Sequence, residues 1–262
     1  MTVSKNRSQN TCVDVRTSAL HPDRSTMPSV DELKRAWIAV SEGQFRDAAW
    51  TPAEPTVVVV GAAGGVGAST VALALAEASG DAVLVDGAGS SESGLIAAGR
   101  TELGSANGWV RSARGPVLIV RSTAPASPPP TSDGLTVVDL GGSLPRNRRV
   151  SPRWLQNGPV VVVATATVPG LRRLEHLLSD PPARFALAIR GERRWAAHMS
   201  AYLGPTTKTA VADGRSVTVP FDSHVALHGL NPDDLPKPLV AAGARLLQVL
   251  NLHPSTVSKG LS

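Results

Sequence analysis

From residue 56 onward, short runs of consecutive apolar residues alternate with longer segments that have apolar residues at helical spacing. Runs of roughly four to eight apolar residues, many of them β-branched, are typical of strands buried on both faces of a sheet. The predicted strands are TVVVV (56–60), AVLVD (82–86), PVLIV (116–120), LTVVDL (135–140), PVVVVAT (159–165), RFALAIR (184–190) and SVTVP (216–220). Helices are predicted between them at about 67–79, 91–98, 147–156, 168–179, 193–203 and 236–250. The alternation predicts an α/β fold, a doubly wound and mostly parallel sheet with helices on both faces.

The ends of the chain have a different pattern. Residues 1–30 are polar and aperiodic, and such a segment buries too little apolar surface to order itself, so we expect a disordered tail there. Residues 31–55 predict an amphipathic helix followed by a proline-bearing linker. The predicted domain organisation is therefore a tail (1–30), a helix and linker (31–55), the α/β domain (56–252) and a second tail (253–262).

Length and composition narrow the class of protein. The 262 residues are 42% hydrophobic, which is enough for one sizeable core. No window approaches the roughly 18 apolar residues needed to cross a bilayer, and the first thirty residues lack the apolar run of a secretory signal. We therefore expect a cytoplasmic protein without a membrane span. The single cysteine, Cys12, can form no intrachain disulfide, and the six histidines show no metal-ligand spacing.

The net charge of +5 is concentrated in the second half of the chain. Residues 141–262 hold fifteen basic and seven acidic side chains. Such a surplus permits contact with DNA phosphates or with an acidic protein partner, although arginines on a solvated surface explain it equally well. The arginines that we consider candidates for DNA or partner contact are Arg146, Arg148, Arg149, Arg153, Arg172 and Arg173.

The first predicted strand runs directly into the glycine-rich segment GAAGGVGAST (61–70), which opens the first predicted helix. Glycines between a strand and a helix allow successive backbone N–H groups to surround an anion, and the helix N-terminus adds partial positive charge. A glycine-rich turn alone is a weak signal, but the Ser-Thr pair at the helix start adds hydroxyls suited to Mg²⁺ and phosphate. The candidate phosphate-binding residues are Gly61, Gly64, Gly65, Val66, Gly67, Ala68, Ser69 and Thr70, with Ser69 also a candidate for Mg²⁺.

This segment resembles the deviant Walker A loop of the ParA/MinD superfamily of P-loop NTPases, whose usual form is KGGVGKST or KGGVGKTT. Ala63 and Ala68 stand where the family has its two lysines. The Gly-Ala-Ser-Thr sequence also resembles the loops of degenerate CpaE/TadZ and septum-site-determining-like members. The resemblance implies the P-loop NTPase fold of the ParA/MinD type, with ATP or ADP and Mg²⁺ as cofactors unless these have been lost with the lysines.

Further segments resemble the same family in the same order along the chain. AVLVDGAGS is similar to the family's second strand and places Asp86 at its first switch aspartate, a candidate catalytic residue. LTVVDLGGSLP resembles the Walker B strand and gives Asp139 an indirect role at Mg²⁺. SVTVPFD is similar to the segment whose proline, here Pro220, borders the adenine. Arg190 stands where the family often has an asparagine that contacts adenine, and we interpret it as a surface arginine.

The missing lysines shape the functional hypothesis. A charged hydrogen bond to phosphate contributes roughly 1.5–3 kcal/mol, and cations that stabilise phosphoryl transfer contribute about 10³–10⁵ in rate. Their loss should therefore impair hydrolysis more than binding. We expect a protein that binds ATP or ADP weakly or for regulation, hydrolyses little of it, and acts in DNA partitioning or in positioning a pilus, septum or conjugation machine.

Its expected partners are a protein, non-specific DNA and a second copy of the chain, although the missing signature lysine leaves nucleotide-driven dimerisation open. An active ATPase of the ParA partition type and a nucleotide-free scaffold are the two alternatives.

Overall fold

The computed structural model describes residues 50–53, 55–88, 93–122, 128–130, 133–142, 152–191 and 197–252. The predicted tails at 1–30 and 253–262 and the predicted helix after residue 30 lie outside these ranges. Among the described helices, none has both the length and the apolar character needed to cross a bilayer.

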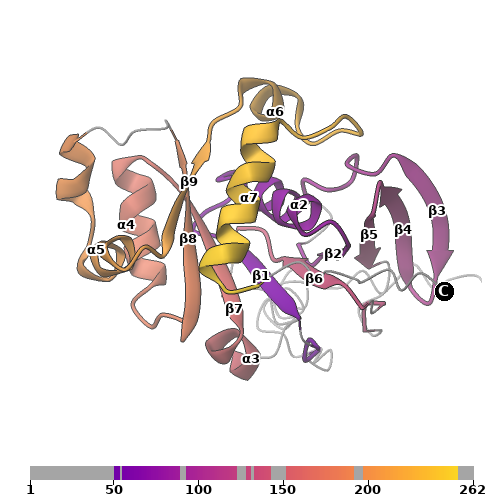
Figure 1. The fold of residues 1–262 in the computed structure, drawn as a ribbon, viewed down its shortest axis with the longest axis horizontal. Coiled ribbons are helices and arrows are strands. Elements are labelled where there is room, and N and C mark those ends of the chain that lie inside the picture. The colour runs from indigo at the N-terminus through magenta and orange to yellow at the C-terminus, as the bar shows by residue number, and fades with distance from the viewer. Residues whose placement is uncertain are drawn as a thin grey trace, which may run out of the picture. The chain divides into compact units, whose positions relative to one another are not determined.

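Within these ranges nine strands form one sheet in the order β3-β4-β5-β2-β6-β1-β7-β8-β9 (Figure 1). From β5 to β9 all neighbours are parallel, whereas β4 is antiparallel to both β3 and β5. The strands are β1 (Thr56–Gly61), β2 (Ala82–Asp86), β3 (Thr101–Ala106), β4 (Trp109–Arg114), β5 (Val117–Ser122), β6 (Leu135–Asp139), β7 (Pro159–Thr165), β8 (Arg184–Gly191) and β9 (Ser216–Pro220). The helices are α2 (Ala68–Ser79), α3 (Pro152–Asn157), α4 (Val168–Leu177), α5 (Pro205–Ala212), α6 (Ser223–His228), α7 (Lys237–Val249) and a 3₁₀ helix, η1 (Ala197–Tyr202).

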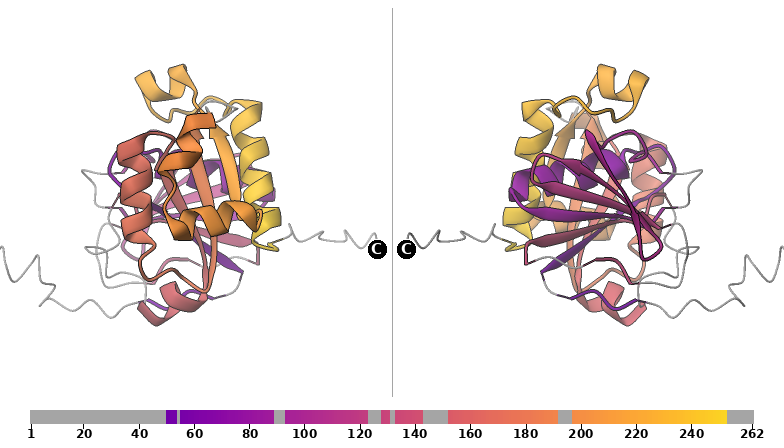
Figure 2. Two further views of the ribbon diagram at one scale, coloured as in Figure 1. Left: turned by 90° about the vertical axis from the view of Figure 1, so that its left-hand side faces the viewer. Right: turned by 90° about the vertical axis from the view of Figure 1, so that its right-hand side faces the viewer.

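The central strands are buried on both faces, as their uninterrupted apolar runs predict. Val57 and Val59 of β1 belong to the core beneath α2 and α7, while Val60 belongs to the core beneath α4 on the other face. This division follows from the two-residue period of a strand, which sends successive side chains to opposite faces. Figure 2 shows the sheet nearly edge-on, with α4 on one side and α7 on the other. The predicted α/β class with a mostly parallel, doubly wound sheet is confirmed.

The structure corrects several predicted helices. Residues 93–98 fall in the predicted helix 91–98 but contain no helix, because the amides of Gly94 and Leu95 bond to serine hydroxyls instead. The predicted helix 193–203 is, in its described part, the 3₁₀ helix η1. Helix α5, which follows at Pro205–Ala212, was not predicted.

The sequence interpretation also missed the antiparallel hairpin of β3 and β4. The strands TELGSA and WVRSAR have no continuous apolar run, and β3 is exposed along most of its length at the sheet edge. Between them, Asn107 and Gly108 have φ angles of 52° and 79°. This pair of positive φ angles is the conformation of a tight two-residue hairpin turn, for which Asn-Gly is the preferred sequence. The sequence signal was therefore present in the turn rather than in the strands.

Helices α2 and α7 pack closely on one face of the sheet, and a glycine permits the contact. A Cβ atom at Gly243 of α7 would lie 2.3 Å from the carbonyl oxygen of Ala74 in α2. Because that neighbour is backbone, a larger residue would have to separate the two helices. The position of α2, and of the loop before it, therefore depends on Gly243.

We predict that Gly243→Ala destabilises the protein by roughly 1–3 kcal/mol through overpacking. Alanine in a helix ordinarily stabilises by about 1 kcal/mol relative to glycine, so the sign of the change is diagnostic. Urea unfolding measures it, with Ala241→Ser on the exposed side of α7 as the control. An unchanged or increased free energy of unfolding in Gly243→Ala would contradict the close packing.

Candidate functional site

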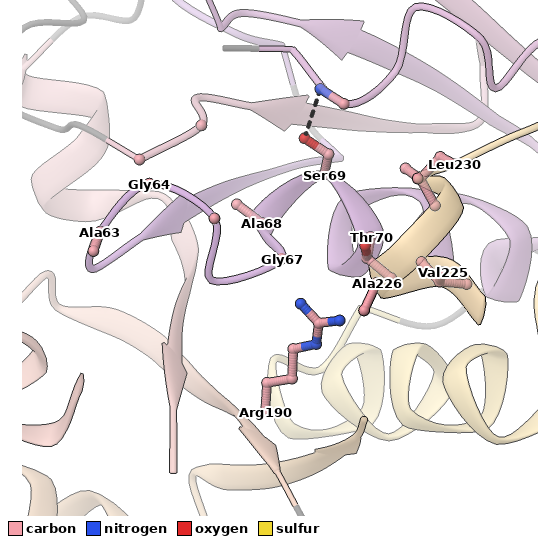
Figure 3. Close-up of a pocket in the computed structure, with 15 residues that line it drawn as sticks. Ala63, Gly64, Gly67, Ala68, Ser69, Thr70, Arg190, Val225, Ala226 and Leu230 are labelled. Carbon is pink, nitrogen blue, oxygen red and sulfur yellow. Dashed lines mark hydrogen bonds between the residues drawn. The ribbon is translucent and has the colours of Figure 1, made fainter. Parts of the chain in front are cut away.

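A cavity of about 600 Å³ opens at the carboxyl edge of the sheet, where β1 passes into α2 (Figure 3). Parallel sheets bind ligands at this edge because the loops and helix N-termini gather there. The glycine-rich loop and the first turn of α2 form one wall, and the segment from α6 to Leu230 forms the opposite wall. Its described lining residues are Ala63, Gly64, Gly65, Gly67, Ala68, Ser69, Thr70, Gly94, Gly141, Gly142, Arg190, Val225, Ala226, Gly229 and Leu230.

The first residues of the glycine-rich loop are anchored by backbone hydrogen bonds, whereas three later amides have no acceptor among the described residues. The Gly61 amide donates to the Gly141 carbonyl at 2.7 Å, and the Ala62 amide donates to the Val163 carbonyl at 2.8 Å. Gly65 and Gly67 have φ angles of 74° and 94°, which only glycine adopts without strain. Among the hydrogen bonds of the described residues, none comes from the amides of Gly64, Gly65 or Gly67. The loop therefore presents backbone donors next to the N-terminus of α2, which suits an anion.

The candidate phosphate-binding residues from the sequence divide into two groups. Gly64, Gly65, Gly67, Ala68, Ser69 and Thr70 line the cavity. Gly61, Val66 and Pro220 are not among its described lining residues; Gly61 anchors the loop, and Val66 is buried in the core beneath α2. Pro220 ends β9 beside Gly191 of β8, one residue before Phe221.

Two buried carboxylates lie behind the first turn of α2. Asp86 and Asp139 end the neighbouring strands β2 and β6 and are register partners, with exposed fractions of 1% and 0%. One oxygen of each is engaged: Asp86 accepts from the Ser93 hydroxyl, and Asp139 accepts from the Gly141 amide at 2.9 Å. The second oxygens, Asp86 Oδ1 and Asp139 Oδ2, are buried and have no hydrogen-bond partner among the described residues.

Burial determines the acidity of both groups. It raises the pKa of Asp86 to about 6, against the opposing effect of the Ser93 hydroxyl. Burial also raises the pKa of Asp139, opposed by the Ser69 hydroxyl and the Gly141 amide. The neighbouring charge of Asp139 also raises the pKa of Asp86, and the positive charge of Arg121 in β5 lowers it without cancelling the effect of burial.

These groups fit Mg²⁺, which prefers hard oxygen ligands and is usually held by one or two carboxylates together with water and phosphate. The unpartnered oxygens of Asp86 and Asp139, with the Ser69 hydroxyl, would supply the protein's share. In the described part of the chain no group of three or more acidic, histidine or cysteine side chains could hold a metal by itself. Water and a bound phosphate would supply the remaining ligands of a cation held here.

Arg190, which we interpreted from the sequence as a surface arginine, lies half-buried in the cavity instead. It stands near the end of β8, and its guanidinium points toward the glycine-rich loop (Figure 3). A Cβ atom at Gly67 would lie 2.8 Å from its Nη1 atom. Sequence reasoning missed this residue because its contact with the loop joins positions more than a hundred residues apart.

The far wall of the cavity is held by a second arginine. Arg114 of β4 is 2% exposed and pairs with Glu77 of α2. It also donates to the carbonyls of Asn231 and Asp233, in the segment that follows the cavity wall. These bonds join the hairpin, α2 and the wall segment into one unit.

The candidate DNA- or partner-contacting arginines are only partly described. Arg172 and Arg173 are exposed on α4. Arg153 belongs to α3, and Arg146, Arg148 and Arg149 lie outside the described residues.

Comparison with known proteins finds likeness in backbone structure alone. No protein-family model matches the sequence, and no curated protein matches it. A Borrelia burgdorferi protein described as a plasmid partition protein, bound to AMPPNP, superimposes with a TM-score of 0.49 at 14% identity, covering 76% of this chain and 98% of that one. The MinC:MinD cell division complex of Aquifex aeolicus gives a TM-score of 0.49 at 13% identity, covering 74% and 96%.

A third similar structure is the cell division ATPase MinD of Pyrococcus furiosus, with a TM-score of 0.46 at 16% identity, covering 75% of this chain and 98% of that one. These three structures are described as proteins of plasmid partition and of cell division. At these identities and TM-scores, the function must be argued from the chain's own residues.

We predict that Asp86→Asn stabilises the metal-free protein by roughly 2 kcal/mol at pH 7.5. The folded-state pKa of Asp86, about 6, lies above its unfolded value of 3.8. The stability that protonated Asp86 contributes is therefore present at low pH and is lost as the pH rises through about 6. Asparagine carries no charge to bury at pH 7.5.

Thermal unfolding in EDTA measures this effect, and Asp180→Asn, at an exposed aspartate, is the control. A melting temperature of Asp86→Asn at or below that of the wild type would show that the carboxylate is not under electrostatic strain.

Proposed function

We propose that this chain binds the phosphate chain of ATP or ADP together with Mg²⁺, hydrolyses it slowly, and uses the bound state to position or recruit a partner. The observation that carries the proposal is that Gly64, Gly65 and Gly67, whose amides have no hydrogen-bond acceptor among the described residues, line a cavity at the N-terminus of α2. The volume of the cavity lies within the range of roughly 300–1,000 Å³ that is usual for small-molecule sites.

Three sources of attraction favour phosphate at this place. Among the described residues, the amides of Gly64, Gly65 and Gly67 have no hydrogen-bond acceptor, and α2 adds its N-terminal partial charge without a side-chain cap. Asp86 and Asp139 would hold Mg²⁺, and the cation would supply positive charge beside both the buried carboxylates and the phosphate. We therefore expect nucleotide binding to depend on Mg²⁺.

Slow hydrolysis follows from the composition of the loop. Ala63 and Ala68 line the cavity where the resembling family has lysines, so no loop side chain can neutralise charge that develops on a transferring phosphoryl group. Preorganised charge of this kind is usually the largest contribution to phosphoryl transfer. Binding depends less on it, because the backbone donors remain.

The positioning role rests on the sequence resemblance to the ParA/MinD superfamily and its degenerate members. In that hypothesis the nucleotide state controls contact with a protein partner, with DNA or with a second copy of the chain in the cytoplasm. Positioning would then depend on binding of the partner, and fast ATP hydrolysis would not be required.

An active partition ATPase is the second candidate, and Arg190 is the observation that favours it. A cation inside the cavity could take over part of the catalytic role of a loop lysine. Turnover measurements decide between the two candidates.

We predict that isothermal titration of the full chain with ATP and ADP gives binding that weakens strongly when EDTA replaces Mg²⁺. Ala68→Lys should bind ATP at least about tenfold tighter, since one charged hydrogen bond contributes roughly 1.5–3 kcal/mol. It should also raise ATP hydrolysis well above the wild-type rate, measured as phosphate release with Mg²⁺ and DNA.

Ala241→Lys, which adds the same charge on the exposed side of α7, is the control for net charge. Rapid wild-type hydrolysis would favour the active ATPase. No heat of binding and no thermal shift with millimolar ATP or ADP would favour the nucleotide-free scaffold.

For the DNA hypothesis we predict that Arg172→Ala combined with Arg173→Ala weakens binding to non-specific duplex. The slope of log affinity against log salt should fall by about 1.8, because each lost phosphate contact contributes about 0.9. Fluorescence anisotropy across a salt series measures this slope, with Lys237→Ala combined with Arg245→Ala on α7 as a matched charge control. An unchanged slope would remove these two arginines from the interface.

A further inference from the structure

The cavity contains a cation that does not come from the glycine-rich loop. Among its described lining residues, Arg190 is the one with a charged side chain, and it reaches in from β8. Its backbone is fixed from both sides, because it is the register partner of Thr165 in β7 and of Val219 in β9. The Ala166 amide also donates to its carbonyl at 2.8 Å. This pairing restricts the direction in which the Arg190 side chain can extend.

That place is the last loop residue before α2. A Cβ atom at Gly67 would lie 2.8 Å from Nη1, 3.2 Å from Cδ and 3.4 Å from Cζ of Arg190. The guanidinium and the end of its aliphatic stem therefore occupy the space beside Gly67 that a side chain there would need. This contact needs glycine for its space, and the φ angle of 94° needs glycine for its conformation.

One aromatic and one acidic residue, Phe221 and Asp222, lie near the guanidinium, but neither accepts a hydrogen bond from it. Its Cζ atom lies 5.1 Å from the centroid of the Phe221 ring, in a cation–π contact. Asp222 favours its charge, but the Asp222 Oδ1 atom accepts from the Val225 amide as the cap of α6. Among the described residues no hydrogen bond or ion pair engages the Arg190 side chain. Burial accordingly lowers the pKa of Arg190.

The position is unfavourable for a cation when the cavity holds no anion. A helix N-terminus carries a partial positive charge of roughly half a unit and therefore repels another positive group. Here the free amides of the loop, the start of α2 and the guanidinium all direct positive charge into one space. An anion between them would turn each of these repulsions into an attraction.

We propose that Arg190 is the phosphate-binding cation of this cavity, a planar donor supplied by β8 where the loop side chains are alanine. The inference rests on the proposed function and names the group that binds its ligand. A guanidinium offers paired donors in a fixed fork and contacts two phosphate oxygens at once. The ligand class is therefore a di- or triphosphate, with affinity set mainly by the phosphates and less by the base.

The test is isothermal titration of the full chain with Mg²⁺ and ADP, ATP or inorganic pyrophosphate. Arg190→Ala should weaken all three by at least about tenfold, the effect of one charged hydrogen bond. Arg190→Lys should retain part of the affinity, because it keeps the charge and loses the fork. Ala68→Lys introduced into Arg190→Ala should restore binding, because it returns a cation to the same cavity.

Two further variants separate this role from a structural one. Arg245→Ala removes the same charge from the exposed side of α7 and should leave binding unchanged. Phe221→Leu removes the ring that faces the guanidinium and should weaken binding only a few-fold. If Arg190→Ala fails to fold in a thermal melt, Arg190→Gln, which preserves most of the packing, takes its place.

The outcomes distinguish this inference from the proposed function. Wild-type binding that is equalled or exceeded by Arg190→Ala would show that the arginine merely fills the cavity, and it would overturn the inference alone. Absence of binding by both the wild type and Ala68→Lys would overturn the proposed function and the inference with it. Binding by Arg190→Ala but not by the wild type would identify the arginine as a plug.

Discussion

The strand-to-helix corner between β1 and α2 is the constraint on which the rest of this structure depends. Gly67 starts α2 in a left-handed conformation, and the twelve residues that follow are buried almost throughout. Because α2 packs against both the sheet and the neighbouring helix α7, its orientation is fixed, and its N-terminus lines the cavity. Packing on one side of the sheet thus fixes the direction of the amides at its edge, and the chemistry of the cavity follows from that direction.

The charges around this corner are arranged as two incomplete halves. Behind the first turn of α2, Asp86 and Asp139 present buried oxygens without partners, and their raised pKa values record the cost of burial. In front of it, Arg190 lies against Gly67 without an ion pair among the described residues. A divalent cation with a polyphosphate would complete both halves at once, whereas either component alone would leave one half unsatisfied.

The sequence predicted the parts of the fold that depend on local pattern. Runs such as TVVVV specify a buried strand because several β-branched residues in succession have no polar face to expose. The same logic failed for β3 and β4, whose residues face solvent at the sheet edge and whose signal lies in the Asn107-Gly108 turn. It failed again at 93–98, where the hydroxyls of Ser69, from α2, and of Ser93, within the segment, accept from the amides of Gly94 and Leu95.

In the candidate site, too, the sequence indicated the residues that belong to a local pattern and missed the one that depends on long-range contacts. The glycine-rich loop is one continuous segment, so its spacing could be interpreted directly, and the strand-terminal aspartates followed from the alternation of elements. Arg190 could not be found in this way, because its role depends on the pairing of β8 with β7 and on the absence of a side chain at Gly67. Only the folded chain brings these features together.

The opposite wall shows which part of the site is preformed. Arg114 and Arg100 bind the segment after Leu230 through its carbonyls and through Asp234, and Arg114 is itself buried against α2. The segment after Leu230 therefore moves only if the hairpin and α2 move with it.

Helix α6, which belongs to the same wall, differs, since none of its residues is buried and Leu227 is 79% exposed. A ligand that draws the two walls together would accordingly meet least resistance from α6. Because Phe221 and Asp222 lie just before α6 and also hold Arg190, movement of this helix would be coupled to the position of the guanidinium.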